Sequence, residues 1–252
     1  MAQSPNIHQV RTRLVNSYVI EYTDKLMVMD VAVKCHRYVL GFIEHELRRD
    51  IAEVQLVICS HDDPDHIGGV FALAGLSNAM VGIPFASNLT LHKIRNNPYG
   101  GLVRLQTSLR EAFRPRSWTM YVNPQRDRNA RSKPKFTGQP PQDNKLRPQR
   151  ADYRLRNGDP LPGFADWTVI HTPGHSWDSC CYYHPQSRSL LTGDTLLGSG
   201  KHSKLVVPSI YANARQTRET LQKLRNLDIE AVYPGHGSII EGSDLIPASL
   251  SA

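Results

Sequence analysis

The stretch SHDDPDHIGG, residues 60–69, places two histidines and three aspartates within six positions and closes on a pair of glycines. It follows IAEVQLVIC, residues 51–59, whose apolar and β-branched content predicts a buried strand. The polar side chains are therefore expected on the loop at the carboxyl end of a strand, which is where α/β proteins build their sites. This motif predicts both an α/β fold and a functional site.

The segments on either side of the motif also predict strands and helices. Residues 15–30 first alternate between apolar and polar residues and then become mostly apolar, with turn residues between the two runs. This pattern predicts a β-hairpin ending at Asp30. Apolar residues recur at helical spacing over residues 36–50. After the motif, residues 68–79 predict a short helix that ends near Gly75, followed by another strand. The first half of the chain thus alternates strands and helices.

A second α/β half is predicted beyond residue 150. Residues 165–175 predict a strand, and a hairpin is expected about residues 185–189. Residues 213–227 predict a helix, and residues 229–237 predict a final strand. The order β, α, β mirrors that of the first half.

Seven polar residues stand at the ends of these strands: His61, Asp63, Asp65, His66, His175, Asp194 and His236. Strand ends at one edge of a sheet can bring such residues together. Imidazoles and carboxylates together are ligands for zinc, iron or manganese. Seven of them suffice for two metal ions.

These blocks resemble the metallo-β-lactamase-fold hydrolase superfamily. SHDDPDHIGG, TPGHS, LLTGDTLL and VYPGHG match its HxHxDH motif and its later His, Asp and His blocks in order, and NSYVIEYTDKLMVMD is similar to its N-terminal hairpin. The resemblance covers residues 15–238 apart from an insertion. It implies an α/β fold, a four-layered αββα sandwich, which we expect to form a single domain over residues 1–252.

The resemblance also implies a two-metal site, with two Zn²⁺ ions, or alternatively iron or manganese, as cofactors. One ion would be held by His61, Asp63 and His175. The other would be held by Asp65, His66 and His236. Asp194 would bridge both ions.

Such a centre implies a metal-dependent hydrolase. Two cations lower the pKa of a bridging water toward about 7 and stabilise the oxyanion that forms after attack. Asp65 and Asp194 are the predicted catalytic carboxylates, and Asp194 would orient the hydroxide. The expected target is an ester, thioester, lactone or lactam-type bond, and the blocks after Thr172 are similar to those of thioester and lactone hydrolases.

Asp63 departs from the family pattern, which has histidine at this position. A carboxylate can ligate the same ion and favours harder ions such as iron or manganese. Glutamate here resembles the di-iron redox branch of the superfamily, and aspartate resembles its DNA-uptake membrane proteins. A di-iron redox or oxygen-sensing protein is therefore an alternative hypothesis.

Substrate contacts are expected from residues outside the metal ligands. Lys201 and His202, in GSGKHSK shortly after Asp194, are candidates to bind a carboxylate or phosphate of a small-molecule substrate. A solvated glycine-rich loop is the alternative interpretation of this segment.

A basic insertion is expected over residues 96–150. Within it, a helix around residues 102–113 is expected to precede a long irregular stretch. Between Lys93 and Arg156 the chain has sixteen Lys and Arg against four Asp and Glu, a net +12, which leaves −5 for the rest of the +7 chain. The insertion is expected to be a lid or a solvated loop. Its charge also raises the alternative of a phosphodiesterase or nuclease that binds nucleic acid.

Composition sets the remaining expectations. The chain has 252 residues, of which 40% are hydrophobic, and its apolar runs are shorter than the roughly 20 residues of a membrane span. No membrane partner is expected, and the N-terminus does not read as a secretion signal, so we expect a cytoplasmic protein. The four cysteines lack CxxC spacing and are expected to be buried thiols. The sequence predicts no particular oligomeric state.

Overall fold

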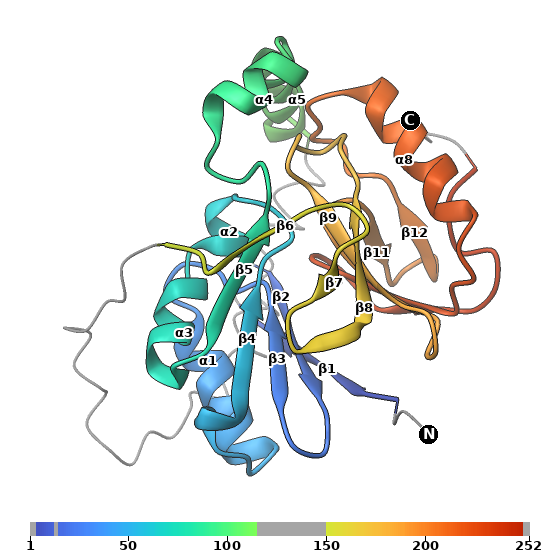
Figure 1. Cartoon of the computed structure of the whole chain (residues 1–252). Helices are drawn as coiled ribbons and strands as arrows, with labels where there is room; N and C mark the ends of the chain where they lie inside the picture. Colours follow the sequence, from blue (N-terminus) through green and yellow to red (C-terminus); the bar gives the residue numbers. More distant parts are fainter. Residues whose placement is uncertain (1–3, 13–14, 115–149, 249–252) are drawn as a thin grey trace. The chain divides into compact units, whose positions relative to one another are not determined.

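The structure of the protein, a computed structural model, describes residues 4–12, 15–114 and 150–248 (Figure 1). Its backbone contacts divide the chain into two compact units. The first is Met1–Ile83 with Asn123–Arg154, and the second is Pro84–Val122 with Leu155–Ala252. The single domain over residues 1–252 stays a prediction.

The first unit contains a six-stranded sheet in the order β1-β2-β3-β4-β5-β6. Its strands are β1 Asn6–Arg11, β2 Asn16–Glu21, β3 Leu26–Met29, β4 Val54–Ile58, β5 Met80–Pro84 and β6 Tyr153–Leu155. β2 and β3 form the predicted antiparallel hairpin, whereas β3, β4 and β5 run parallel. Parallel neighbours end at the same edge of a sheet, so Asp30 after β3 and Ser60 after β4 come together there.

Short helices connect these strands. They are α1 His36–Gly41, which continues as a π-helix over Phe42–Glu46, a 3₁₀ turn Ile51–Glu53, α2 Pro64–Ile67 and α3 Val70–Ser77. Val70 and Leu73 of α3 are fully buried in the same core cluster as Val57 and Val81 of the sheet. Burial of these side chains against the parallel strands holds α3, and with it the motif, on the sheet.

The predicted end of this helix near Gly75 is wrong. α3 continues to Ser77 and is closed by Asn78, whose φ of 57° is left-handed. Glycine is the usual residue at such a helix end, but asparagine also adopts the left-handed conformation. Gly75 stays within the helix because the following turn is still packed against the core, where Ser77 is buried.

The second unit contains a six-stranded sheet in the order β14-β13-β10-β9-β8-β7 and a separate hairpin, β11-β12. The strands are β7 Pro160–Leu161, β8 Phe164–His171, β9 Cys180–His184, β10 Ser189–Gly193, β11 Leu197–Ser199, β12 Lys204–Val206, β13 Ala231–Pro234 and β14 Ile240–Glu241. β10 and β13 are parallel and are connected through α8, Ala214–Arg225. The predicted β, α, β order of this half is confirmed. The sequence did not predict β11 and β12, which flank the segment whose alternative interpretation was a solvated glycine-rich loop.

α8 illustrates how sequence determines this unit. The side chain of Asn213 accepts hydrogen bonds from the backbone amides of Arg215 and Gln216 and so caps the helix. Leu221 and Leu224 of the helix are buried in one cluster with strand residues such as Val232. The cap and the apolar face together fix the start of α8 beside the loop that carries His175.

The start of the expected insertion is regular structure. α4, Thr90–Asn96, was not predicted, whereas the helix expected around residues 102–113 is present as α5, Gly100–Ala112. α5 buries Thr107 and Glu111, while Leu102, Leu105 and Leu109 lie on its solvent side, 53–67% exposed. This arrangement is the reverse of an ordinary amphipathic helix.

Most of the predicted insertion, residues 115–149, lies outside the described residues. Its expected roles as a lid or as a nucleic-acid contact therefore stay predictions. Within the described ranges, no helix is both long and apolar enough to cross a bilayer.

All four cysteines are buried thiols, as expected. Cys180 and Cys181 are adjacent in β9, where successive side chains point to opposite faces of the sheet. Burial raises the pKa of the Cys180 thiol well above its ordinary value, so this thiol stays protonated at neutral pH.

Candidate metal centre

The four N-terminal candidate ligands lie together in the first unit, on the segment that follows β4. His61 belongs to the loop, Asp63 is the N-cap residue of α2, and Asp65 and His66 lie within that helix. Pro64 occupies the first turn of α2, where its fixed φ suits a helix start. The expectation that these ligands all sit on a loop is therefore corrected for Asp65 and His66.

Both histidines are fully buried and packed on each other. The rings of His61 and His66 have centroids 4.1 Å apart, and neither residue exposes any surface. Asp63 Oδ2 lies 3.1 Å from His61 Nε2, and Asp65 Oδ2 lies 3.7 Å from His66 Nε2. The two carboxylates thus face the Nε2 atoms of the two imidazoles.

The opposite ring nitrogens are held by Asp30 and Ser60. His66 Nδ1 lies 2.8 Å from Asp30 Oδ2, and His61 Nδ1 lies 2.9 Å from Ser60 Oγ. Asp30 also accepts hydrogen bonds from the backbone amide of Ser60 at 2.7 Å and from its hydroxyl at 2.9 Å. A carboxylate only accepts, so His66 Nδ1 carries the proton that it donates to Asp30.

This network turns the Nε2 atoms of His61 and His66 toward the carboxylates. Metal-binding histidines generally donate their other ring N–H to a carboxylate, a carbonyl or water. Two such nitrogens beside two carboxylates form a donor set that fits zinc, iron or manganese. The residues of the first unit therefore fit half of the predicted centre.

Sequence reasoning missed Asp30 and Ser60 as functional residues. Asp30 was identified only as the end of a hairpin strand, although it is fully buried and has a left-handed φ of 55°. A usable signal was present: β3 and β4 are predicted consecutive strands, and a polar residue directly after each is expected at the same sheet edge.

The three C-terminal candidate ligands lie together in the second unit. Asp194 directly follows β10 and faces two imidazoles: Oδ1 lies 3.3 Å from His236 Nε2, and Oδ2 lies 3.7 Å from His175 Nε2. His175 Nδ1 donates to the carbonyl of Ile210 at 2.9 Å, so its Nε2 carries the lone pair. The bidentate position of Asp194 between two ring nitrogens fits the role of a shared ligand.

Glycine backbones bring the Asp194 and His236 loops close together. The amide of Gly235 donates to the carbonyl of Gly193 at 2.8 Å, which ties the His236 loop to the Asp194 loop. Gly198 pairs with Gly237, and a Cβ on Gly198 would lie only 1.8 Å from the carbonyl oxygen of Ser238. Gly198 of GDTLLG and Gly237 of PGHG are therefore required by this close approach.

The loop of His175 is anchored by a buried carboxylate that the sequence did not single out. Asp178 exposes no surface and accepts hydrogen bonds from Ser87 at 2.7 Å and from Ser176 at 2.9 Å. Lys93 Nζ of α4 lies 2.7 Å from Asp178 Oδ1. This paired charge fixes the loop that follows His175.

Arg104 of α5 is a further residue that sequence reasoning missed. Its Nη2 lies 3.3 Å from His175 Nε2, the nitrogen that carries the lone pair. α5 is held to this loop region by Thr107, whose hydroxyl lies 3.1 Å from the carbonyl of Tyr211. Nothing in the sequence distinguished Arg104 from the other cations of its basic region.

Lys201 and His202 lie in the turn between β11 and β12, and both are exposed. The backbone amide of His202 donates to the carbonyl of Ser199, which closes the turn. Their substrate-binding role stays a prediction.

Comparison with known proteins shows the family to which the chain belongs. A family model of the metallo-beta-lactamase superfamily matches residues 10–84 and 110–236, which is most of the chain. The chain belongs to this superfamily. The match supports the prediction that the protein is an enzyme, a metal-binding hydrolase.

Curated relatives match over shorter stretches. Lactamase-like protein aptB from Emericella nidulans is 32% identical over 73 residues, 29% of this chain and 21% of the relative. Atrochrysone carboxyl ACP thioesterase from Aspergillus fumigatus is 33% identical over 73 residues, again 29% of this chain and 21% of the relative. Probable metallo-hydrolase YqjP from Bacillus subtilis is 29% identical over 91 residues, 34% of this chain and 28% of the relative. The matched stretches span less than a third of these three relatives.

Solved structures share the fold over nearly the whole chain. A metallo-beta-lactamase family protein from Thermus thermophilus has a TM-score of 0.59 and 21% identity, covering 94% of this chain and 75% of that one. The metallo-beta-lactamase FIM-1 from Pseudomonas aeruginosa, in its mono-zinc form, also has a TM-score of 0.59, with 13% identity and coverages of 96% and 87%. The fold class predicted from the sequence is confirmed.

Proposed function

We propose that the protein is a binuclear metal-dependent hydrolase that cleaves an ester, thioester, lactone or lactam-type bond. His61, Asp63 and His175 would hold one ion. Asp65, His66 and His236 would hold the other. Asp194 would bridge the two. Bound ions would supply a hydroxide nucleophile at neutral pH and positive charge for the oxyanion.

The observation that carries this proposal is the orientation of the histidines. The Nδ1 atoms of His61, His66 and His175 are each committed to a neighbouring oxygen, from Ser60, Asp30 and Ile210 respectively. Each ring is thereby oriented with Nε2 toward a carboxylate, where that atom can bind a cation.

Two further observations support the substrate class. One relative is named as an acyl carrier protein thioesterase, which favours a thioester among the candidate bonds. Arg104 cannot hold His175 Nε2 while that atom ligates a cation. Its guanidinium lies beside the proposed ligands, and a guanidinium pairs with an anionic group such as a carboxylate.

Elemental analysis combined with a hydrolysis panel tests the proposal. Protein purified without added metal, and protein reconstituted with zinc, iron or manganese, should bind two transition-metal ions per chain. The loaded protein should hydrolyse at least one chromogenic ester, thioester, lactone or β-lactam. Less than about half an equivalent of metal after reconstitution would contradict the metal centre. Cleavage of only bis-aryl phosphodiesters would instead support the nuclease hypothesis.

Asp63 is proposed as a ligand that sets metal preference. Replacement by histidine, Asp63→His, should retain hydrolysis and shift the preference toward zinc, because imidazole suits zinc better than a carboxylate suits it. The measurement is competition between zinc and manganese for the metal-free protein, read by elemental analysis. Asp62→His, one position away, is the matched control and should leave the preference unchanged. An unchanged preference in Asp63→His would show that Asp63 is not a ligand.

A further inference from the structure

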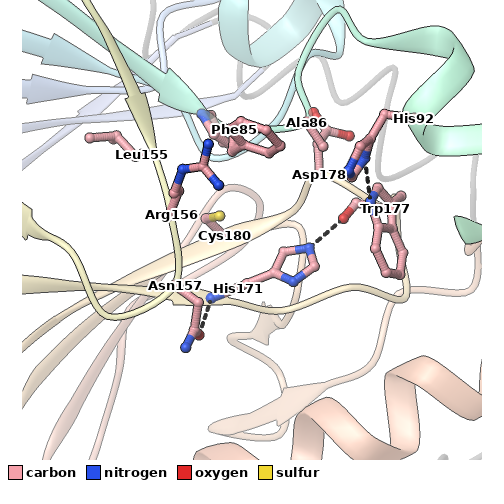
Figure 2. A pocket seen from close by; sticks show the side chains of 11 residues that line it. Phe85, Ala86, His92, Leu155, Arg156, Asn157, His171, Trp177, Asp178 and Cys180 are labelled. Atoms are coloured by element: carbon pink, nitrogen blue, oxygen red, sulfur yellow. Dashed lines mark hydrogen bonds between the residues drawn. The ribbon is translucent and has the colours of Figure 1, made fainter.

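A cavity of about 330 Å³ lies in the second unit, beside the loop that carries His175 (Figure 2). None of its lining residues is a predicted metal ligand. A closed cavity of about 150 Å³ accommodates benzene, so this volume suits a ligand of roughly twelve non-hydrogen atoms. Pockets of this size that combine apolar walls with few polar groups are typical of small-molecule sites.

Four rings form the wall of the cavity and hold one another in place. The indole Nε1 of Trp177 donates to His92 Nδ1 at 3.2 Å, and His171 Nε2 donates to the carbonyl of Trp177 at 2.6 Å. The His171 and Trp177 rings meet edge to face with centroids 5.2 Å apart, and Phe85 meets His92 in the same way at 5.5 Å. Because these contacts hold the rings to one another, the wall is pre-organised for binding.

The wall is also electrically neutral. Burial lowers the pKa of His171 below its ordinary value, and the nearby charge of Lys223 acts in the same direction. The thiol of Cys180 is protonated, as noted above. The charge of the Asp178 carboxylate is compensated by Lys93, and its oxygens also accept hydrogen bonds from the hydroxyls of Ser87 and Ser176. The interior therefore favours an apolar group.

One cation completes the cavity. The guanidinium carbon of Arg156 lies 3.9 Å from the centroid of the Phe85 ring, stacked on it, as Figure 2 shows. Arg156 makes no ion pair within the described part of the chain. Stacking on an aromatic face leaves the N–H edges of a guanidinium able to bind an anion, and their geometry matches a carboxylate.

We propose that this cavity is a binding site for a small organic carboxylate, whose aryl or acyl group lies among the four rings and whose carboxylate pairs with Arg156. A phosphate ester fits less well, because a dianion beside a single cation in an apolar cavity keeps uncompensated charge. The site lies outside the predicted metal ligands, so it stands independently of the proposed reaction.

Isothermal titration with 4-phenylbutyrate, which has twelve non-hydrogen atoms, tests the site on the metal-loaded protein. The neutral isostere 4-phenylbutanamide has the same number of non-hydrogen atoms and serves as the comparison ligand. We expect 4-phenylbutyrate to bind at least about tenfold more tightly than the amide, because a hydrogen bond to a charged group contributes more than a neutral one. Arg156→Gln should remove this difference. Arg218→Gln, an exposed arginine of α8, is the matched control and should retain it.

A second variant locates the ligand. Ala86→Leu fills the cavity and should weaken the acid and the amide alike by roughly tenfold or more, with near-UV circular dichroism as the check on folding. Equal binding of acid and amide to the unaltered protein would overturn the proposal. So would an equal loss in Arg156→Gln and Arg218→Gln, since the carboxylate would then bind elsewhere. Arg156→Gln decides the question even if Ala86→Leu does not fold.

Discussion

Asp194→Asn is expected to lower kcat/KM for hydrolysis by at least about a hundredfold while the protein stays folded. The carboxylate oxygens lie 3.3 Å from His236 Nε2 and 3.7 Å from His175 Nε2, so one residue faces two predicted ligands. An amide of the same shape removes the negative charge that would bridge two cations. A hundredfold loss corresponds to about 2.7 kcal/mol of transition-state stabilisation.

Asp166→Asn is the matched control for this variant. Asp166 also pairs with a histidine, because its Oδ2 lies 3.1 Å from His184 Nε2, and both residues belong to the same unit as Asp194. Neither Asp166 nor His184 is a predicted metal ligand, so kcat/KM of Asp166→Asn should differ from that of the unaltered protein by less than about twofold. Steady-state kinetics and metal content are measured on all three proteins. Full activity with two bound ions in Asp194→Asn would place the chemistry elsewhere.

The sequence predicted the candidate ligands because their signal is local. Each polar residue of the motif follows directly on an apolar strand, and this order can be read without knowing which strands are neighbours. The same holds for β10 and β13, where Asp194 and His236 follow strands that the structure confirms. Whether the ligands of the two units share one centre rests on the proposed function.

The supporting residues could not be predicted in this way, since they act across the sequence. Asp30 reaches Ser60 only because β3 and β4 are parallel neighbours. Asp178 is anchored by Lys93, 85 positions earlier, and Arg104 reaches His175 across 71 positions. Such contacts depend on packing that hydrophobic periodicity does not specify.

α5 shows where periodicity misleads. A helix around residues 102–113 was predicted correctly, and an ordinary amphipathic helix would bury an apolar face that includes Leu102, Leu105 and Leu109. The structure buries Thr107 and Glu111 instead. Helical spacing determines which residues share a face, whereas the neighbours of the helix determine which face is buried.

Asp30→Asn is expected to lower the affinity for metal by about 10- to 100-fold, the range typical for loss of a partner behind a metal-binding histidine. The backbone amide of Ser60 donates to Oδ1 at 2.7 Å, so the oxygen of asparagine should keep that position. Its NH₂ group then replaces Oδ2, which lies 2.8 Å from His66 Nδ1. An NH₂ group donates, so His66 Nδ1 must become the acceptor, and its proton moves to Nε2, the nitrogen that faces Asp65.

Affinity and folding separate this effect from simple destabilisation. Chelator competition on the metal-free protein measures affinity, and urea unfolding of the same samples measures stability. Asp166→Asn changes an equivalent Asp–His pair at β8 and should leave the metal affinity unaltered. Ser60→Ala keeps Asp30 bonded to His66 Nδ1 and should weaken binding less than Asp30→Asn. If Asp30→Asn bound both ions as tightly as the unaltered protein, Asp30 would only support the fold, and the tautomer of His66 would not control the site.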